Sequence, residues 1–257
     1  MARILAIANQ KGGVGKTTTS INLAAGLSRA GKRVLLVDLD PQANATMGSG
    51  VDKRAPHATV YEVLLGESDI RGARIHCKSG GFDLVPANQE LAGAEIELVG
   101  LEHRENRLKN ALVEVDPEYD FVLIDCPPAL NLLTVNGLTA AHSVMIPMQC
   151  EYYALEGLSD LVQTIKKVRN HLNPSLEIEG LLRTMHDPRN TLSHQVSEQL
   201  QKHFGSKVYR TIIPRNVRLA EAPSHGIPAI HFDQQSKGAL AYLSLADEVL
   251  RLPSATH

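Results

Sequence analysis

The chain contains no tryptophan, and aromatic residues make up only 4% of its 257 residues. A core without large rings must be filled by Val, Ile, Leu and Ala, the residues that parallel sheets prefer. A hydrophobic fraction of 43% suffices for one large core, and an α/β chain of this length usually forms one domain. We therefore expect a single α/β domain over residues 1–257.

Cysteine is also scarce. The three thiols are odd in number and never stand in C-x-x-C spacing: Cys77, Cys126 and Cys150. This pattern argues against a disulfide framework and favours a reducing compartment. The eleven histidines likewise never fall in a metal-binding spacing such as H-E-x-x-H, which argues against a zinc site.

Long apolar runs are missing too. No stretch approaches the ~18 apolar residues that a membrane-spanning helix needs. The opening residues MARILAIAN hold a short apolar run that leads directly into a glycine-rich segment, so we interpret them as a strand and not as a signal peptide. Together with the cysteine pattern, these features predict a cytoplasmic protein without a membrane partner.

The formal net charge of −2 hides an uneven distribution. Between Arg183 and Arg218 there are seven Lys or Arg residues and two acids, which gives this window a charge of +5 and leaves −7 for the rest. Chance clustering on a solvated face explains such a window about as well as a binding patch does. The alternative interpretation is a local basic surface that binds a polyanion, on a protein that is otherwise acidic.

Short apolar runs alternate with helical patterns along the chain, which predicts βαβ units and a mostly parallel sheet. Most of the runs are continuously apolar, as in strands buried on both faces. The expected strands are 3–9, 33–40, 82–87, 120–128, 143–149, 177–185 and 208–214. The expected helices are 17–29, 155–171, 190–203 and 238–251, and we expect loops and short helices over 48–80.

A glycine-rich segment, NQKGGVGKTTT over 9–19, lies between the first expected strand and helix. Its glycines let backbone N–H groups turn toward phosphate oxygens, and the helix N-terminus adds partial positive charge. We expect Lys16 to reach the β and γ phosphates and the Thr17 hydroxyl to bind Mg²⁺. The ordinary G-x-x-x-x-G-K-[ST] pattern, however, needs a glycine where Gln10 stands and does not need the second lysine, Lys11.

Two other expected strands end in aspartate. VDLDPQ places Asp38 and Asp40 at the end of one strand, and FVLIDCPP places Asp125 at the end of another. In an open α/β sheet these ends face the ligand crevice. We predict that Asp125 holds Mg²⁺ through water, that Asp38 is a second metal-site candidate, and that Asp40 orients the attacking water. Phosphoryl transfer depends mainly on such positioning and on charge neutralisation.

With Lys11 five residues before Lys16, the loop resembles the deviant Walker A motif of the ParA/MinD ATPases. Four further segments are similar to the Soj-like chromosome-partitioning branch: DLDPQANAT, DCPPALNLLTVN, QCEYYALEGL and IPRNVRLAEAPSHGIP. The similarity runs from Ile4 to about Val249. It implies a P-loop NTPase fold, with a mostly parallel twisted sheet flanked by helices on both faces, and Mg²⁺-dependent ATP hydrolysis that is slow without a partner protein.

The resemblance also implies that two subunits sandwich two ATP molecules. Lys11 would reach the partner's phosphates, and Gly12 would stay small because the two loops meet. The implied catalytic residues are Lys11, Lys16, Asp40 and Asp125. The implied nucleotide contacts are Lys11, Gly12, Gly13, Val14, Gly15, Lys16, Thr17 and Thr18 in the loop, with Pro214 and Asn216 beside the adenine.

In Soj-like proteins the ATP dimer binds double-stranded DNA without sequence preference, and the arginines responsible match Arg189 and Arg218. Both fall inside the basic window, and Lys237 is a candidate to extend the same face. Such binding releases counterions and should weaken with salt. The sequence MHDPRN around Arg189 departs from the leucine that relatives often have before the aspartate. The implied partner is a ParB-like centromere-binding protein, and the implied location is the nucleoid.

Three other functions are alternatives to chromosome partitioning. A MinD-like membrane cycle needs a basic amphipathic C-terminal helix, and the tail LSLADEVLRLPSATH has one arginine, two acids and a proline. Redox chemistry like that of the nitrogenase iron protein needs two interface cysteines in a context that this chain lacks. A ParA-like ATPase that positions another cargo stays open. Because the first expected strand begins at Arg3, we expect no N-terminal helix-turn-helix and no operator reading.

Overall fold

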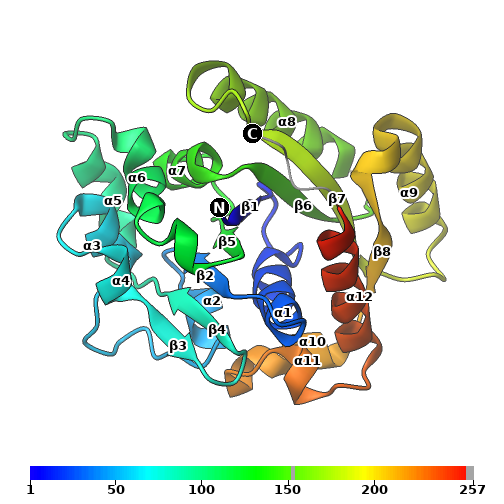
Figure 1. The fold of residues 1–257 in the computed structure, drawn as a ribbon. Helices are drawn as coiled ribbons and strands as arrows, with labels where there is room; N and C mark the ends of the chain where they lie inside the picture. The colour runs from blue at the N-terminus through cyan, green and yellow to red at the C-terminus, as the bar shows by residue number, and fades with distance from the viewer. Residues whose placement is uncertain (152–153, 253–257) are drawn as a thin grey trace.

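A computed structural model of the protein describes residues 1–151 and 154–252. Eight strands form one sheet in the order β3-β4-β2-β5-β1-β6-β7-β8, and only the β3–β4 pair is antiparallel. Figure 1 shows this sheet crossing the molecule. The strands are β1 (Arg3–Ile7), β2 (Val34–Asp38), β3 (Ile75–Cys77), β4 (Phe82–Val85), β5 (Phe121–Asp125), β6 (Ser143–Gln149), β7 (Glu177–His186) and β8 (Val208–Pro214).

Helices connect the parallel strands. They are α1 (Lys16–Arg29), α2 (Asn44–Gly48), α3 (Val60–Leu65), α4 (Ile70–Ala73), α5 (Leu91–Leu98), α6 (Arg107–Val113), α7 (Leu132–Ala140), α8 (Ala154–His171), α9 (Thr191–Phe204), α10 (Val217–Glu221), α11 (Ala229–Phe232) and α12 (Lys237–Arg251). Short 3₁₀ turns lie at η1 (Arg104–Asn106), η2 (Asp116–Glu118), η3 (Gly205–Lys207) and η4 (Ala222–His225). No helix in the described ranges is long and apolar enough to span a membrane.

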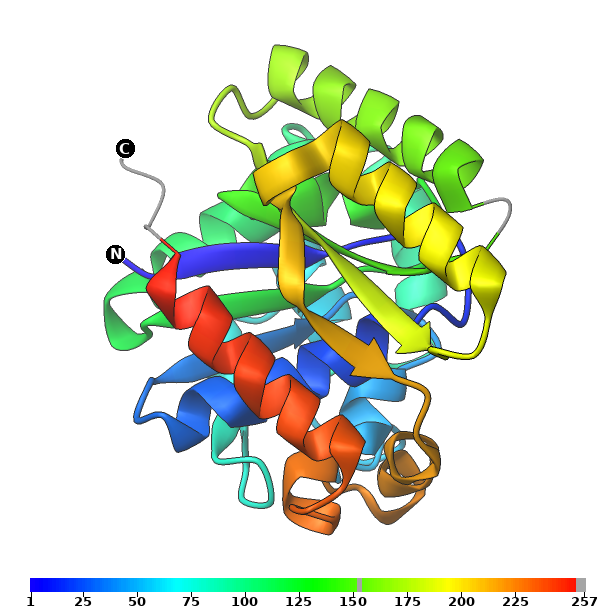
Figure 2. The same cartoon turned by 90° about the vertical axis from the view of Figure 1, so that its right-hand side faces the viewer.

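The sheet is covered on both faces, which explains its continuously apolar strands. Successive side chains of a strand point to opposite faces. Leu35 therefore packs into the cluster with α5 to α9, while Leu36 packs into the cluster with α1 and α12. Figure 2 shows α8 and α9 on one side of the sheet and α1 and α12 on the other. The predicted fold class, a mostly parallel sheet flanked by helices, is confirmed.

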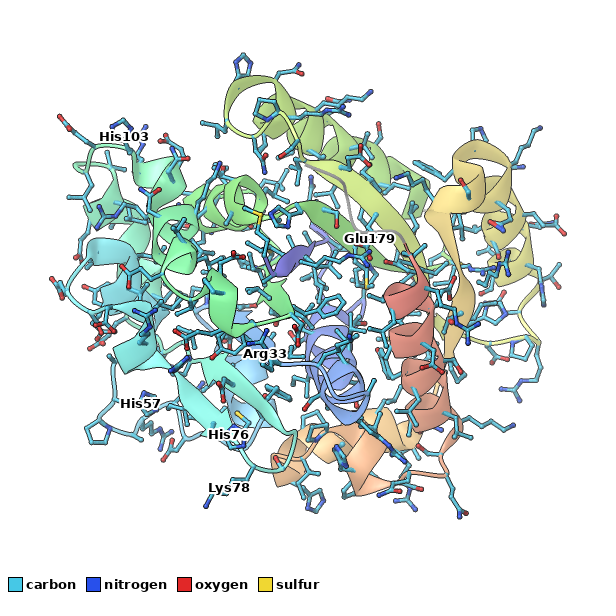
Figure 3. All side chains as sticks on the ribbon, viewed as in Figure 1. Arg33, His57, His76, Lys78, His103 and Glu179 are labelled. Carbon is cyan, nitrogen blue, oxygen red and sulfur yellow. The ribbon has the colours of Figure 1, made fainter. Side chains whose placement is uncertain are left out.

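Polar contacts hold the start of β1 against the far strands of the sheet. The Glu179 carboxylate, labelled in Figure 3, is buried on β7 and lies 2.7 Å from the Arg3 guanidinium. It also accepts hydrogen bonds from the hydroxyls of Tyr209 (2.6 Å) and Ser143 (2.7 Å). A buried charge needs such partners, because an uncompensated one is strongly destabilising. This network ties β1, β6, β7 and β8 together away from the glycine loop.

All seven expected strands and all four expected helices are present, with shifts at their ends. Strand β3 and the helices α5, α6, α7, α10 and α11 are not among the predicted elements. Strand β3 has three residues, too few to show alternation. Helix α7 is buried nearly all round, so it lacks the polar face that reveals an amphipathic helix.

Candidate functional site

The glycine loop crosses from the end of β1 to the start of α1. Gly13 and Gly15 have φ of +73° and +89°, in the left-handed region that other residues rarely adopt. Gly15 is also the N-cap of α1, and no side chain caps this helix, so its first N–H groups remain available to a ligand. Such an N-terminus favours an anion. The Thr184 hydroxyl fixes the loop by donating to the Val14 carbonyl at 2.7 Å.

Lys16, on the first turn of α1, is buried at the centre of the loop. Its ammonium donates to the Lys11 carbonyl at 3.2 Å, so the side chain folds back inside the ring of backbone groups. Burial lowers the pKa of Lys16, while the nearby charge of Asp125 opposes that shift. A partly desolvated cation inside a ring of backbone N–H groups suits phosphate oxygens.

Asp125 ends β5 directly behind the loop and is fully buried. One carboxylate oxygen accepts from the Thr17 hydroxyl and the other from the Ser20 hydroxyl, both at 2.8 Å. Burial, followed by the charge of Asp38, raises the pKa of Asp125 to about 7. These oxygens fit Mg²⁺, which prefers one or two carboxylates with further oxygen ligands from water and phosphate. The structure brings Lys16, Thr17 and Asp125 together, and their roles toward phosphate and Mg²⁺ stay predictions.

Asp38 and Asp40 lie at the end of the neighbouring strand, β2. Asp38 is aligned with Asp125 across the sheet and is fully buried. Burial raises the pKa of Asp38 to about 6. Its carboxylate accepts from both the amide and the hydroxyl of Thr46, at 2.8 and 2.7 Å. Asp40 is buried to 8% exposure and accepts from the Gln42 amide at 2.9 Å.

Lys11 differs from Lys16 in its surroundings. Its side chain is 44% exposed and forms an ion pair with Glu151 of the same chain at 2.6 Å. The loop backbone here is held by the Asn9 side chain, which accepts from the Lys11 amide at 3.0 Å. A Cβ atom added to Gly12 would meet no other atom within 4 Å. The space around Lys11 and Gly12 is therefore open in the single chain.

Pro214 ends β8, next to the end of β7, and Asn216 follows two residues later. Asn216 caps α10, because its side chain accepts from the Arg218 amide at 2.9 Å. The backbone pairs Pro214 with His186, and the Arg215 amide donates to the His186 carbonyl at 3.2 Å. The loop that carries Arg189 and the segment that leads to Arg218 on α10 therefore leave adjacent strand ends. The role of Pro214 and Asn216 beside an adenine stays a prediction.

The three predicted DNA-binding residues are exposed. The Arg189 side chain is 88% exposed and forms a two-pronged contact with Asp187, at 2.9 and 3.0 Å. Arg218 is 48% exposed and contacts Glu221 at 2.8 Å and Asp233 at 3.2 Å. Lys237 starts α12 four residues after Asp233 and has no ion pair within the described ranges. Asp233 thus places Arg218 and Lys237 in one area.

The basic window needs one correction. Arg183, counted among its seven cations, is buried and donates to the Ser197 hydroxyl and the Tyr209 carbonyl, both at 2.8 Å. It supports the joint between β7, β8 and α9 and contributes no surface charge. A count of charges cannot distinguish an arginine of a buried strand from one of a loop, although its position inside the apolar run EIEGLLRTM was a signal.

Thiol and histidine chemistry finds no support. Burial raises the pKa of Cys126, as expected for an inert buried thiol, and the His225 ring stacks on Phe232 with centroids 4.8 Å apart. Figure 3 shows His57, His76 and His103 well apart from one another. Across 1–151 and 154–252, no group of three or more His, Cys, Asp or Glu side chains is arranged to hold a metal by itself.

Several residues that contact the site were not singled out from the sequence, and three of them bear on its charged groups. They are Ser20 and Thr46, which donate to the two buried carboxylates, and Glu151, which pairs with Lys11. Ser20 lies three residues after Thr17 on a helix, so both hydroxyls face the same side, and this spacing was a usable signal. Thr46 and Glu151 come from segments whose path only the folded chain reveals.

A buried lysine inside a glycine loop at a helix N-terminus, with aspartates at the ends of neighbouring parallel strands, defines a P-loop nucleoside-triphosphate-binding protein. Comparison with known proteins agrees. Residues 2–178 match a family profile described as "AAA domain". A solved structure from Mycobacterium smegmatis, titled cobyrinic acid a,c-diamide synthase with bound ATP analogue and magnesium, superposes with a TM-score of 0.86. It is 43% identical, over 98% of this chain and 95% of that one.

Two curated relatives make the family clear. The sporulation initiation inhibitor protein Soj of Bacillus subtilis is 57% identical, over 97% of this chain and 98% of its own. The chromosome partitioning protein ParA of Caulobacter vibrioides is 52% identical, over 96% of this chain and 94% of its own. The chain belongs to the Soj/ParA family of chromosome-partitioning ATPases.

Proposed function

We propose that this protein hydrolyses ATP with Mg²⁺, dimerises around the bound nucleotide and binds DNA as the dimer. A ParB-like partner then resets it by stimulating hydrolysis, and its place of action is the nucleoid. The observation that carries this proposal is the contrast between two lysines of one loop. Lys16 is buried behind the phosphate-binding backbone, whereas Lys11 is exposed beside open space at Gly12.

In the proposed reaction the chain's own groups position the reactants. The loop N–H groups and Lys16 bind the β and γ phosphates, and Asp40 accepts a hydrogen bond from the attacking water. Thr17 and Asp125 would hold Mg²⁺, which when bound neutralises charge on the phosphate oxygens. Asp125 must be ionised for this, so metal binding favours the deprotonated carboxylate.

The proposed dimer contact uses Lys11. To reach a partner's phosphates, the ammonium must leave Glu151, and this exchange costs little because an ion pair between half-exposed side chains is weak. Phosphate carries more negative charge than one carboxylate, so the partner's nucleotide competes well for the lysine. ATP binding and dimerisation are then coupled through one side chain.

The proposed DNA surface contains Arg189, Arg218 and Lys237. Arg189 lies in the loop after β7, Arg218 lies on α10 after β8, and Lys237 starts α12. The ends of β7 and β8 are paired next to each other, on the side of the sheet that carries the nucleotide loop. Because the contacts would go to phosphates and not to bases, sequence preference is not expected. A dimer doubles the number of cations, which strengthens binding and its dependence on salt.

The test is a DNA titration with random-sequence duplex in ADP, in ATP, and in ATP after Lys11→Ala. We expect binding only with ATP, its loss on Lys11→Ala, and a steep decline as salt rises. Arg189→Glu combined with Arg218→Glu should abolish DNA binding while ATP-dependent dimerisation persists, as measured by light scattering. Equal affinity in ADP and ATP would refute the switch, and a double variant that still binds would place the surface elsewhere.

A further inference from the structure

The Asp38 carboxylate is already occupied by donors from its own chain. One oxygen accepts from the Thr46 amide (2.8 Å) and the Thr46 hydroxyl (2.7 Å), and the other accepts from the Asp40 amide (3.1 Å). A carboxylate has about four lone-pair positions, so three are used. Asp38 is also fully buried. Little capacity remains for a metal or its water.

Asp125 presents a different set of donors. Both of its contacts come from hydroxyls, those of Thr17 and Ser20. A hydroxyl can rotate and present its oxygen to a cation instead of its proton to the carboxylate. Two of the three donors on Asp38 are backbone N–H groups, which have no such freedom. The two aligned aspartates are therefore prepared for different tasks.

Thr46 connects the Asp38 carboxylate to two other segments. Its hydroxyl donates to Asp38 and accepts from the amide of Ala87, which follows β4, at 2.9 Å. Thr46 is fully buried on α2, the helix that begins four residues after the loop aspartate Asp40. This one side chain thus fixes α2 relative to both β2 and β4.

Two backbone amides of the turn between Asp40 and α2 donate hydrogen bonds to Asp40. The Ala43 amide donates to the Asp40 carbonyl at 2.8 Å, and the Gln42 amide donates to its Oδ1 at 2.9 Å. Ala43 has φ of +56°, an uncommon value for a residue with a side chain, so the surrounding contacts must hold it there. Within the described ranges, no donor contacts Oδ2 of Asp40. That oxygen remains available to water.

We propose that Asp38 and Thr46 form a buried unit that positions Asp40 for hydrolysis, and that Asp38 is not a ligand of the metal. The proposal rests on the proposed role of Asp40 in orienting the attacking water. Asp38 fixes the Asp40 backbone from one side, and Thr46 fixes α2, which receives the chain after Asp40. Thr46 is thereby a positioning residue, since it acts on the water only through Asp40.

The first experiment compares Thr46→Val with Thr46→Ser. Valine keeps the shape of threonine but removes the hydroxyl, whereas serine keeps the hydroxyl. We expect Thr46→Val to lower kcat for ATP about tenfold, as displacement of a catalytic group does. Its affinity for Mg²⁺-ATP should stay within about twofold of wild type, because the nucleotide contacts lie elsewhere. Thr46→Ser should restore kcat. An unchanged kcat in Thr46→Val, or an equal loss in Thr46→Ser, would overturn the positioning role.

The second experiment measures nucleotide binding instead of turnover. A fluorescent ATP analogue is titrated with and without Mg²⁺ into Asp38→Asn and into the matched variant Asp125→Asn. We expect the Mg²⁺-dependent gain in affinity to persist in Asp38→Asn and to be lost in Asp125→Asn. A comparable loss in both variants would make Asp38 a metal ligand and refute the proposal. Should Thr46→Val fail to fold, this comparison still decides whether Asp38 is a metal ligand, and kcat of Thr46→Ser and of Asp38→Asn tests the positioning of Asp40.

A third variant separates this inference from the function on which it rests. Asp40→Ala should lower kcat at least as much as Thr46→Val, without changing the Mg²⁺ dependence of nucleotide binding. If Asp40→Ala hydrolyses ATP at the wild-type rate, the role of Asp40 in orienting water is wrong. If kcat falls in Asp40→Ala but is unchanged in Thr46→Val, Asp40 still orients the water. Only the positioning role of Asp38 and Thr46 is then rejected.

Discussion

The nucleotide site and the basic surface differ in the burial and the hydrogen-bond partners of their charged side chains. At the strand ends, Lys16, Asp38 and Asp125 are buried, and neighbouring groups of the chain direct every one of them. On the basic surface, Arg189 and Arg218 are exposed. Arg189 pairs with Asp187, and Arg218 pairs with Glu221 and Asp233. The charged groups of the nucleotide site are preorganised, whereas the arginines of the basic surface are paired with acids of the same chain. The first should be sensitive to single atoms, and the second to ionic strength.

The largest expected effect lies in the buried site. Lys16→Ala removes the cation that we propose to bind the phosphates, and we expect ATP hydrolysis to fall at least about a hundredfold, as when one preorganised donor is lost. Thermal unfolding should change little, because a desolvated cation with a lowered pKa is not a source of stability. Turnover and melting temperature, measured side by side with Lys11→Ala, check this. Hydrolysis within about fivefold of wild type would contradict the buried site's role.

The pH dependence of stability is a second test of burial. The pKa of Asp125 is raised to about 7 and that of Asp38 to about 6, both above the values near 4 that are usual in unfolded chains. The folded state without metal therefore binds more protons between about pH 4 and 7, and its free energy of unfolding should fall as pH rises through that window. We expect a decline of several kcal/mol, because each pKa unit corresponds to about 1.4 kcal/mol.

Urea unfolding at a series of pH values, without Mg²⁺, measures this decline. Asp125→Asn is the control, because it removes one titrating group at nearly constant volume. The decline should be shallower in this variant and should level off above pH 7 in the wild type. A wild-type free energy that rises between pH 5 and 7, with no difference from Asp125→Asn, would show that the carboxyls are not raised.

The smallest effect concerns the surface. Asp187→Asn keeps the acceptor for the Arg189 amide but removes the charge that would compete with phosphate in the proposed DNA complex. We expect DNA affinity in ATP to rise about threefold at low salt, the range of exposed ion pairs, and the gain to vanish at high salt. Glu198→Gln is the matched control, since Glu198 is exposed on α9 without an ion pair in the described ranges. Weaker binding in Asp187→Asn would mean that Asp187 positions Arg189 instead of masking it.

Much of the fold could be predicted because its signals are local. The continuous apolar runs of β1, β2, β5 and β6 reflect burial on both faces, and their lengths exclude long helices. Burial on nearly every side, which makes the strands easy to recognise, hides helix α7. It is buried all round and shows no polar stripe from which a period could be read.

The candidate site was predictable only for residues at motif spacing. Lys16, Thr17 and Asp125 follow from a glycine loop and a strand end. In the structure the Thr17 hydroxyl donates to Asp125, and the charge of Asp125 acts on Lys16. Thr46 lies eight residues beyond Asp38, in a segment with no periodic pattern. No spacing rule brings it back to that carboxylate. The left-handed turn at Ala43 does so, and a turn of this kind is not typical of alanine.

The sequence by itself determined the chemistry of this protein: a phosphate-binding glycine loop, two lysines five residues apart, and aspartates at the ends of buried strands. These depend on residue type and short spacing, which the chain carries locally. Only the tertiary structure decided which charges are surface charges and what each carboxylate contacts. It buried Arg183, exposed Lys11 and gave Asp38 three donors from its own chain. Burial and hydrogen bonding depend on neighbours distant in sequence, and packing brings those neighbours together.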